Sequence, residues 1–206
     1  MLYLETIDSP TLALLNQLMQ IPEFSGLNLV GGTSLALQIG HRKSINLDLF
    51  GHLELDDYEF VNALKPFNSV QLINQTTNIK TFLINQIKVD FVNYPYSWLK
   101  PCSIIDGIRL AARSDIAAMK LAAITGRGSK KDFIDIVFLL DEFSLEKMIN
   151  YYRQKFPYGS EFMVLKSLTY FEDAEKEQLP VMLKKVDWNT IRSKIIFETK
   201  NFLKSR

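Results

Sequence analysis

The spacing of apolar residues changes once along this chain, and the change restricts the possible folds more than any other feature. Up to about residue 105, short apolar runs alternate with polar residues as in strands, with helical stretches between them. Beyond that point apolar residues recur every three or four positions, as in 114–125 and 130–142, and predict helices. We therefore expect an α+β domain over residues 1–105 and a helical domain over residues 106–206.

The charges of the chain nearly cancel, because 24 Lys and Arg residues stand against 23 Asp and Glu residues among 206 in all. This balance argues against broad, non-specific binding of nucleic acids, although a local basic groove stays open. No stretch approaches 18 uncharged apolar residues, and the first residues lack a signal-peptide pattern, so we expect no membrane span and a cytoplasmic protein. The single cysteine, Cys102, fits a reducing compartment.

The first part contains two sets of strand-like runs. Residues 27–30 and 45–50 read as strands, with a helix over 33–39 between them. Residues 80–84 and 87–92 also read as strands, and the Asn-Gln pair that separates them predicts a tight hairpin turn.

Two glycines, Gly31 and Gly32, lie where the first strand gives way to a helix. Glycines permit a sharp turn and a close approach of the backbone to a ligand. The N-terminus of the following helix presents free N–H groups, which favour phosphate. Thr33 and Ser34 add hydroxyls that can cap the helix or bind a phosphate oxygen. An ordinary strand-to-helix turn with an N-cap explains the same residues.

Asn46 and Asp48 share one face of a predicted strand, and Leu47 points to the other, because strand side chains alternate. Two oxygen-bearing groups about 6.5–7 Å apart along a strand can converge on Mg²⁺, which takes one or two carboxylates plus phosphate oxygens and water. Asp90 interrupts a later strand, where aspartate is disfavoured. A solvated strand face explains the first pair equally well, and a surface ion pair with Lys88 explains Asp90.

The helical part carries three candidate residues. Lys120 lies on an apolar helix stripe, from which it either extends to solvent or projects an ammonium into a cleft that binds phosphate. Asp132 fits a capping box in which its carboxylate reaches back to the Ser129 N–H. Asp135 lies on the same stripe as Asp132, and the two either form a solvated helix face or point into a cleft.

Three sequence blocks, in this order, are similar to a known family: GGTSLALQIGHRKSINLDLF, DIAAMKLAAITGRGSKKDFIDIVFLL and LTYFEDAEKEQLPVML. The glycine turn, the Asn46/Asp48 pair and Asp90 on a later strand resemble the signature of the DNA polymerase β-like nucleotidyltransferase superfamily. The three blocks together resemble the AbiEii/AbiGii toxin family, the nucleotidyltransferase component of bacterial abortive-infection toxin–antitoxin pairs. The resemblance runs from about Leu29 to Trp188.

This resemblance implies a nucleotidyltransferase fold, a small mixed sheet with flanking helices, followed by a helical domain that completes the active-site cleft. It implies transfer of a nucleoside monophosphate from an NTP, with pyrophosphate leaving and Mg²⁺ as cofactor. Relatives in the superfamily act on the acceptor end of tRNA, so the resemblance makes RNA the leading acceptor and an antitoxin protein a possible partner.

The resemblance also assigns roles to residues. The nucleotide-binding set is Gly31, Gly32, Thr33, Ser34, Arg42, Ser44 and Lys120. The catalytic set is Asp48, Asp90, Lys120, Asp132 and Asp135. The metal set is Asn46, Asp48 and Asp90. Basic residues available for an RNA backbone are Arg42, Lys43, Arg127, Lys130 and Lys131.

Asn46 departs from the family, which has an aspartate at this position. An amide can bind a metal through its oxygen but brings no charge, so metal binding should weaken. Three interpretations stay open: an active enzyme that modifies RNA, an attenuated nucleotide-binding module that acts through a protein partner, and an enzyme whose acceptor is a protein or a small molecule.

Overall fold

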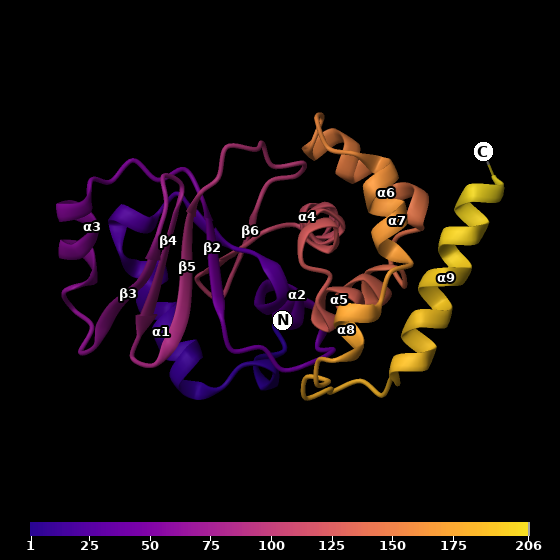
Figure 1. Ribbon diagram of the computed structural model, residues 1–206. Coiled ribbons are helices and arrows are strands. Elements are labelled where there is room, and N and C mark those ends of the chain that lie inside the picture. The colour runs from indigo at the N-terminus through magenta and orange to yellow at the C-terminus, as the bar shows by residue number, and fades with distance from the viewer. Residues whose placement is uncertain (206) are drawn as a thin grey trace. The chain divides into compact units, whose positions relative to one another are not determined.

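The computed structural model describes residues 1–205, and these form two compact units. The sheet unit comprises Met1–Tyr96 and Cys102–Ala111, and the helical unit comprises Ser97–Pro101 and the described chain from Ala112 onward. The predicted boundary lay near residue 105, whereas the sheet unit extends to Ala111 because two further short strands belong to its sheet. Figure 1 shows the elements in chain order by colour.

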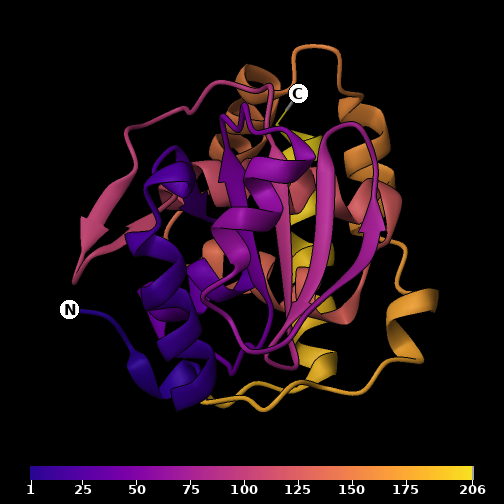
Figure 2. The same cartoon turned by 90° about the vertical axis from the view of Figure 1, so that its left-hand side faces the viewer.

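The sheet unit is built on one mixed sheet of seven strands in the order β3-β4-β5-β2-β1-β7-β6 (Figure 2). The strands are β1 (Leu27–Leu29), β2 (Leu47–Gly51), β3 (Val70–Gln75), β4 (Ile79–Ile84), β5 (Ile87–Asn93), β6 (Ser103–Ile105) and β7 (Ile108–Leu110). The pairs β2–β5 and β1–β7 are parallel, and the other pairs are antiparallel. The predicted mixed sheet with flanking helices is therefore confirmed.

Three α-helices accompany this sheet: α1 (Ser9–Gln20), α2 (Gly31–Ile39) and α3 (Asp57–Leu64). Two 3₁₀ turns, η1 (Leu4–Thr6) and η2 (Pro22–Phe24), flank α1. Asp8 caps α1 by accepting a hydrogen bond from the Thr11 N–H at 2.8 Å. Gly40 ends α2 in the left-handed conformation, with φ +66°, as a C-terminal glycine commonly does.

One face of the sheet, the core face, packs against the helices. Phe60 of α3 stacks on Phe82 of β4 and meets Phe91 of β5 edge-on, at ring centroid distances of 5.4 and 5.0 Å. Phe24 joins them at 4.9 Å from the Phe91 ring. Strand side chains alternate, so the residues next to Phe91 point to the opposite face. That second face carries Asp90 and is called the acidic face below.

Arg109 on β7 fastens the segment that leads into β1. Its guanidinium donates to the main-chain carbonyls of Leu27, Met19 and Phe24 at 2.7, 2.9 and 2.9 Å. Desolvation by burial lowers the pKa of Arg109 from its ordinary value. One side chain thus joins α1, η2 and β1 to β7, which fixes the strand that precedes the glycine turn.

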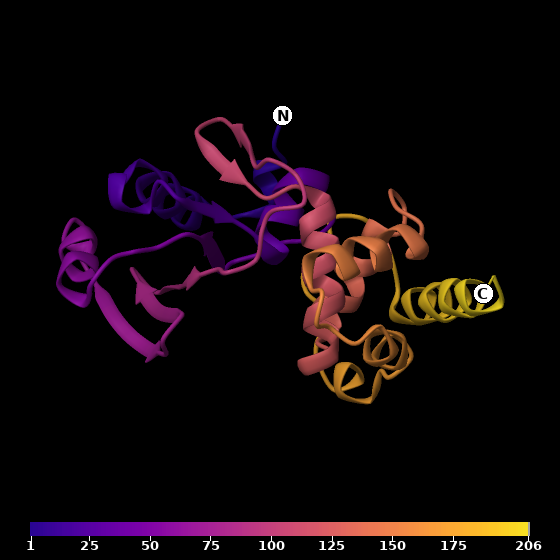
Figure 3. The same cartoon turned by 90° about the horizontal axis from the view of Figure 1, so that it is seen from above.

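The helical unit contains α4 (Arg113–Gly126), α5 (Lys130–Leu139), α6 (Leu145–Lys155), α7 (Glu161–Leu168), α8 (Glu172–Glu175) and α9 (Trp188–Lys204). The helix α4 packs against α5, α6 and α7. The long helix α9, yellow in Figure 3, packs against α5, α6 and α7 as well. Within residues 1–205, no helix combines the length and the apolar character that a membrane span requires.

A buried ion pair ties the short segment 97–101 into the helical unit. Asp115 and Lys155 lie 2.7 Å apart, and both side chains are 0% exposed. The Asp115 carboxylate accepts from the main-chain N–H groups of Leu99 and Lys100 at 2.9 and 3.2 Å. Lys155 donates to the Ser97 carbonyl at 3.0 Å. These contacts give both buried charges the hydrogen bonds that such groups need.

Candidate functional site

The glycine turn lies directly against Asp48. Gly31 begins α2 with φ +66°, a conformation that other residues rarely adopt. A Cβ atom at Gly31 would lie 2.5 Å from the Asp48 Oδ2 atom, closer than real Cβ contacts allow. The Val30 N–H also donates to the Asp48 main-chain carbonyl at 2.9 Å. Both the conformation and the space therefore require glycine at residue 31, and Gly32 follows it in the first turn of α2.

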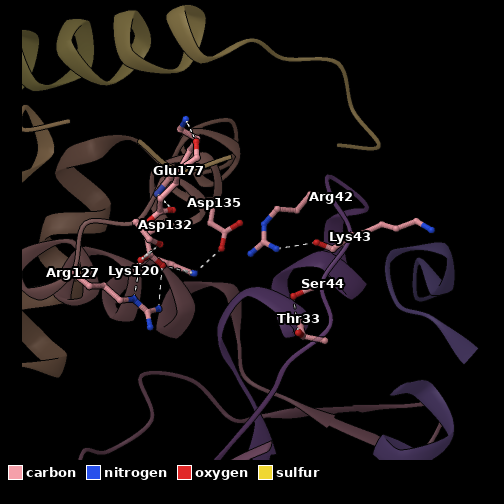
Figure 4. A network of polar contacts seen from close by, with 11 residues as sticks. Thr33, Arg42, Lys43, Ser44, Lys120, Arg127, Asp132, Asp135 and Glu177 are labelled. Carbon is pink, nitrogen blue, oxygen red and sulfur yellow. Dashed lines mark hydrogen bonds and ion pairs between the residues drawn. The ribbon is translucent and has the colours of Figure 1, made fainter. Parts of the chain in front are cut away.

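Thr33 joins the first turn of α2 to the segment that enters β2. Its hydroxyl donates to the main-chain carbonyl of Asn46 and lies 2.8 Å from the Ser44 hydroxyl oxygen (Figure 4). Thr33 is buried, and the Ser44 N–H donates to the Thr6 carbonyl at 2.8 Å. Thr33 thus holds the backbone of Asn46 in place, and the Ser44 hydroxyl contacts the same Thr33 hydroxyl. Their predicted contacts with a nucleotide stay predictions.

Ser34 and Arg42, both predicted to bind the nucleotide, are buried. The Ser34 hydroxyl accepts from the Gln38 amide at 3.1 Å, and that amide also donates to the Ala111 carbonyl at 3.0 Å. One guanidinium nitrogen of Arg42 donates to the Lys43 carbonyl at 3.0 Å (Figure 4). The Ser34 side chain is 0% exposed, and its predicted contact with a nucleotide stays a prediction.

Asp48 and Asp90 are neighbours on the acidic face. They are register partners across the parallel pair β2–β5, and Thr81 of β4 is the partner of Asp90 on its other side. Adjacent strands lie about 4.8 Å apart, so the two carboxylates project side by side. Asn46 is exposed and immediately precedes β2, two residues before Asp48.

Two groups hold the Asp90 carboxylate in position. The Thr81 hydroxyl donates to Oδ1 at 2.6 Å, and the Lys88 ammonium lies 2.6 Å from Oδ2. The ion pair that the simpler interpretation predicted is therefore present. The Lys88 side chain is 45% exposed, and a pair of this kind contributes only ~0–1 kcal/mol to stability. Sequence reasoning missed Thr81, although the two-residue hairpin turn places residues 81 and 90 opposite each other.

The donors on the acidic face suit Mg²⁺. Asp48 and Asp90 offer two adjacent carboxylates, and Asn46 offers an amide oxygen nearby. Among residues 1–205, no three His, Cys, Asp or Glu side chains form a group that could hold a metal ion by themselves. Magnesium is commonly held by one or two carboxylates together with substrate phosphates and water. The set therefore fits a magnesium ion whose remaining ligands are oxygens of a triphosphate and water.

In the helical unit, Lys120 of α4 pairs with two carboxylates of α5 (Figure 4). Its ammonium lies 2.8 Å from Asp132 Oδ1 and 2.6 Å from Asp135 Oδ2. The exposed fractions are 6% for the Lys120 side chain, 1% for Asp132 and 0% for Asp135. Lys120 therefore does not extend to solvent, and the two aspartates are not a solvated helix face.

Arg127 and Ser129 complete this cluster around Asp132. Arg127 donates through Nε to Asp132 Oδ2 at 3.0 Å, and the Ser129 hydroxyl donates to the same oxygen at 2.7 Å. The predicted capping box is wrong in its detail, because the carboxylate meets the Ser129 hydroxyl instead of its N–H. Burial would raise the pKa of Asp132, but the charges of Lys120 and Arg127 outweigh it and hold the pKa below its ordinary value.

Lys130, one of the basic residues considered for an RNA backbone, has contacts inside the helical unit. It is 6% exposed, and its ammonium donates to the main-chain carbonyl of Glu177. The same ammonium lies 5.0 Å from the centre of the Trp188 ring. By contrast, Lys43 and Lys131 are exposed.

One family model matches most of the chain. The family model described as "Nucleotidyl transferase AbiEii toxin, Type IV TA system" matches residues 13–204. An uncharacterised protein of Aquifex aeolicus is 37% identical over 158 residues, which cover 72% of this chain and 75% of that protein.

Solved structures share the fold. The JHP933 protein of Helicobacter pylori superposes with a TM-score of 0.61 at 16% identity, covering 97% of this chain and 94% of that one. MenT4, a nucleotidyltransferase toxin of Mycobacterium tuberculosis, gives 0.58 at 15% identity, covering 91% of this chain and 82% of that one. At these identities the likeness concerns the fold alone.

Proposed function

Because this chain belongs to the AbiEii family of nucleotidyltransferase toxins, we propose that it transfers a nucleoside monophosphate from an NTP to RNA, at the acceptor end of a tRNA. Family membership confirms the resemblance of the three sequence blocks, and with it the transferase activity. The choice of RNA, the dependence on Mg²⁺, the cytoplasmic location and the role in abortive infection are parts of the proposal. A family of toxins also implies an antitoxin as partner.

The observation that supports this proposal best is the adjacency of Asp48 and Asp90 beside the glycine turn. In the transfer, a hydroxyl oxygen of the acceptor forms a bond to the α-phosphorus and loses its proton. The bond from that phosphorus to the β-phosphate oxygen breaks, and pyrophosphate leaves. When bound at Asp48 and Asp90, Mg²⁺ supplies charge neutralisation at the reacting oxygens. The strand register places both carboxylates on one face, and the Thr81 hydroxyl and the Lys88 ammonium hold that of Asp90.

The glycine turn supports a site for the triphosphate at the same place. Gly31 brings the start of α2 into contact with the Asp48 carboxylate. The N–H groups at the start of a helix lack partners within the helix and favour phosphate. A triphosphate bound there would present its oxygens to a metal ion held by Asp48.

The roles of Lys120, Asp132 and Asp135 rest on the resemblance of their sequence block to the family. We propose that this cluster of the helical unit takes part in catalysis and that Lys120 steadies the phosphates. Its ammonium is held between two buried carboxylates. Because the lysine cannot change rotamer without breaking both pairs, the cluster would act as a fixed group and not as a flexible arm.

An attenuated nucleotide-binding module is the second candidate, and Asn46 favours it. Asn46 occupies an exposed position beside Asp48 and contributes no charge, so the site has two carboxylates where the family has three. Such a module would still bind an NTP through the glycine turn and would act through a protein partner.

One experiment separates these candidates. The protein is incubated with α-³²P-labelled NTPs, Mg²⁺ and total RNA, beside the Asn46→Asp and Asp48→Asn variants. Label on RNA with the wild-type protein supports the enzyme. Label only with Asn46→Asp supports the attenuated module. Label on protein, or on a small molecule when RNA is left out, would contradict RNA as the acceptor.

A further inference from the structure

We propose that Phe50, Tyr94 and Tyr96 form a platform on which a nucleobase stacks, beside the two carboxylates of the acidic face. The inference rests on the proposed function, because it deepens that function by giving the base of a substrate its own site. The three residues all belong to the sheet unit.

The strands place these residues on the same face as the carboxylates. Phe50 follows Asp48 by two residues in β2, so the two side chains point the same way. The Tyr94 N–H donates to the Gly51 carbonyl at 2.8 Å, which continues the strand pairing one residue past the end of β5. Tyr94 therefore falls on the face of Asp90, four residues earlier in the chain.

The three rings form a continuous row. The Phe50 and Tyr94 ring centroids are 5.3 Å apart with planes tilted by 49°, and those of Tyr94 and Tyr96 are 5.2 Å apart with a tilt of 59°. Phe50 and Tyr94 are half-buried, and Tyr96 is 43% exposed. The row thus keeps aromatic surface within reach of a ligand, unlike the fully enclosed rings of the core face.

The spacing matches a ligand with an anionic end and an aromatic end. Phe50 lies about 6.5–7 Å along the strand from Asp48, and the row continues away from the carboxylates. A nucleotide whose phosphate lies at the metal ligands would place its base over these rings. Bases stack on aromatic side chains with little dependence on sequence, and removing one such ring commonly weakens binding roughly 5- to 150-fold.

The polar neighbours favour a nucleotide over an apolar protein surface. Asp48 and Asp90 lie beside the rings, and Asn28 of β1 is the register partner of Phe50. An apolar protein segment covering this face would remove the Asp48 and Asp90 carboxylates from water, which is costly. A nucleotide with its metal ion brings positive charge to this face and also the ring that stacks.

The test uses two matched pairs of ligands, both with Mg²⁺. The first pair is an NTP and inorganic tripolyphosphate, which lacks the base. The second pair is a short single-stranded RNA and the same RNA with an abasic 3′-terminal nucleotide. Calorimetry measures the affinity of the wild-type protein and of Tyr96→Ala, Phe50→Leu and Tyr94→Leu. Tyr58→Ala is the control, because Tyr58 is 74% exposed on α3, which packs on the core face.

We expect the three variants to weaken binding of the base-containing member of one pair roughly tenfold, without weakening its base-free partner. The affected pair identifies whether the NTP or the acceptor supplies the base. Tyr58→Ala should bind like the wild type. Phe50→Leu keeps an apolar side chain of similar size, so a thermal melt should show all proteins folded.

Equal affinity for both members of both pairs, or unchanged affinity in all three variants, would overturn the platform. Failure of the proposed function gives a different result. In that case tripolyphosphate with Mg²⁺ would not bind the wild-type protein, and Asp48→Asn would have no effect on NTP binding. The RNA pair tests the platform even then.

Discussion

Asp48 and Asp90 are register partners on the parallel strands β2 and β5, and both side chains point to the same face of the sheet. Two carboxylates so close repel each other unless a cation lies between or beside them. Lys88 provides one such cation at Asp90. Repulsion between the two carboxylates therefore lowers the stability of the metal-free protein, and a bound cation would relieve it.

Asp48→Asn should abolish nucleotidyl transfer while the fold persists. The side chain is half-buried on the acidic face, so the core face is untouched. A metal ion contributes several kcal/mol of transition-state stabilisation, so the loss should exceed roughly 100-fold. The measurement is label transfer from an NTP together with a thermal melt. Activity close to the wild-type level would remove Asp48 from the metal site.

Asn46→Asp should tighten Mg²⁺ binding at nearly constant side-chain volume. Without metal, the third carboxylate adds repulsion, and the melting temperature should fall slightly. With Mg²⁺ at 100 times its Kd, binding should add about 2.7 kcal/mol to the free energy of unfolding. Thermal melts across a Mg²⁺ titration measure both effects. If Mg²⁺ does not change the melting temperature of the variant, the acidic face does not bind the ion.

Gly31→Ala should displace the Asp48 carboxylate. The new Cβ would lie 2.5 Å from Oδ2, and φ +66° costs an alanine roughly 1–2 kcal/mol. We expect lower stability and weaker Mg²⁺-dependent NTP binding, by melting and calorimetry. Gly126→Ala is the matched control, because a Cβ there meets nothing within 4 Å and alanine favours the helix. Equal NTP affinity in the two variants would contradict the close contact at Gly31.

Asp132→Asn should destabilise the protein in a pH-dependent manner. The pKa of Asp132 lies below its ordinary value of 3.8, so its ion pairs stabilise the fold above that pH. Removing one member of a buried pair costs about 3–5 kcal/mol. As the pH falls below 3.8 and through the lower folded-state pKa, the wild type should lose this advantage. Urea unfolding at neutral pH and at decreasing acidic pH measures the difference. A constant difference would show that Asp132 is not ionised in the fold.

Lys155→Met should loosen the segment 97–101. It leaves the Asp115 carboxylate buried without its cation, which costs about 3–5 kcal/mol. Limited proteolysis should then cut within this segment faster than in the wild type. Lys147→Met is the control, because that lysine lies on the same helix and outside the buried pair. Unchanged cleavage would show that the ion pair does not hold the segment.

Local patterns predicted much of the sheet unit. The hairpin turn at Asn85 and Gln86 has φ values of +49° and +68°, which suit a two-residue turn, and it sets the partner of Asp90. The strands β6 and β7 were missed, because each has three residues and pairs with distant parts of the chain. The strand β3 was missed because all of its residues are exposed and its apolar residues, at positions 70, 72 and 73, do not alternate regularly with polar ones.

The partners of the charged residues were harder to predict. Lys120 lies on an apolar stripe of its helix, and this pattern fits both a lysine that extends to solvent and a buried one. Only the packing of α4 on α5 brings Asp132 and Asp135 to its ammonium. Likewise, the sequence placed Asn46 on a strand, whereas Thr33 holds its backbone just before β2 begins. Such outcomes depend on contacts between elements, which local periodicity does not contain.

The segment 97–101 has a consequence for synthesis on the ribosome. Domains generally fold as units while the chain emerges. The sheet unit is incomplete until β7 has emerged, because Arg109 of β7 donates hydrogen bonds to carbonyls in and before β1. By then the segment 97–101 has already emerged, and its anchor Lys155 is still to be made. A segment of the helical unit is therefore synthesised before the sheet unit is complete. No single division of the chain into two fragments would therefore keep both units whole, because each unit consists of two separate segments.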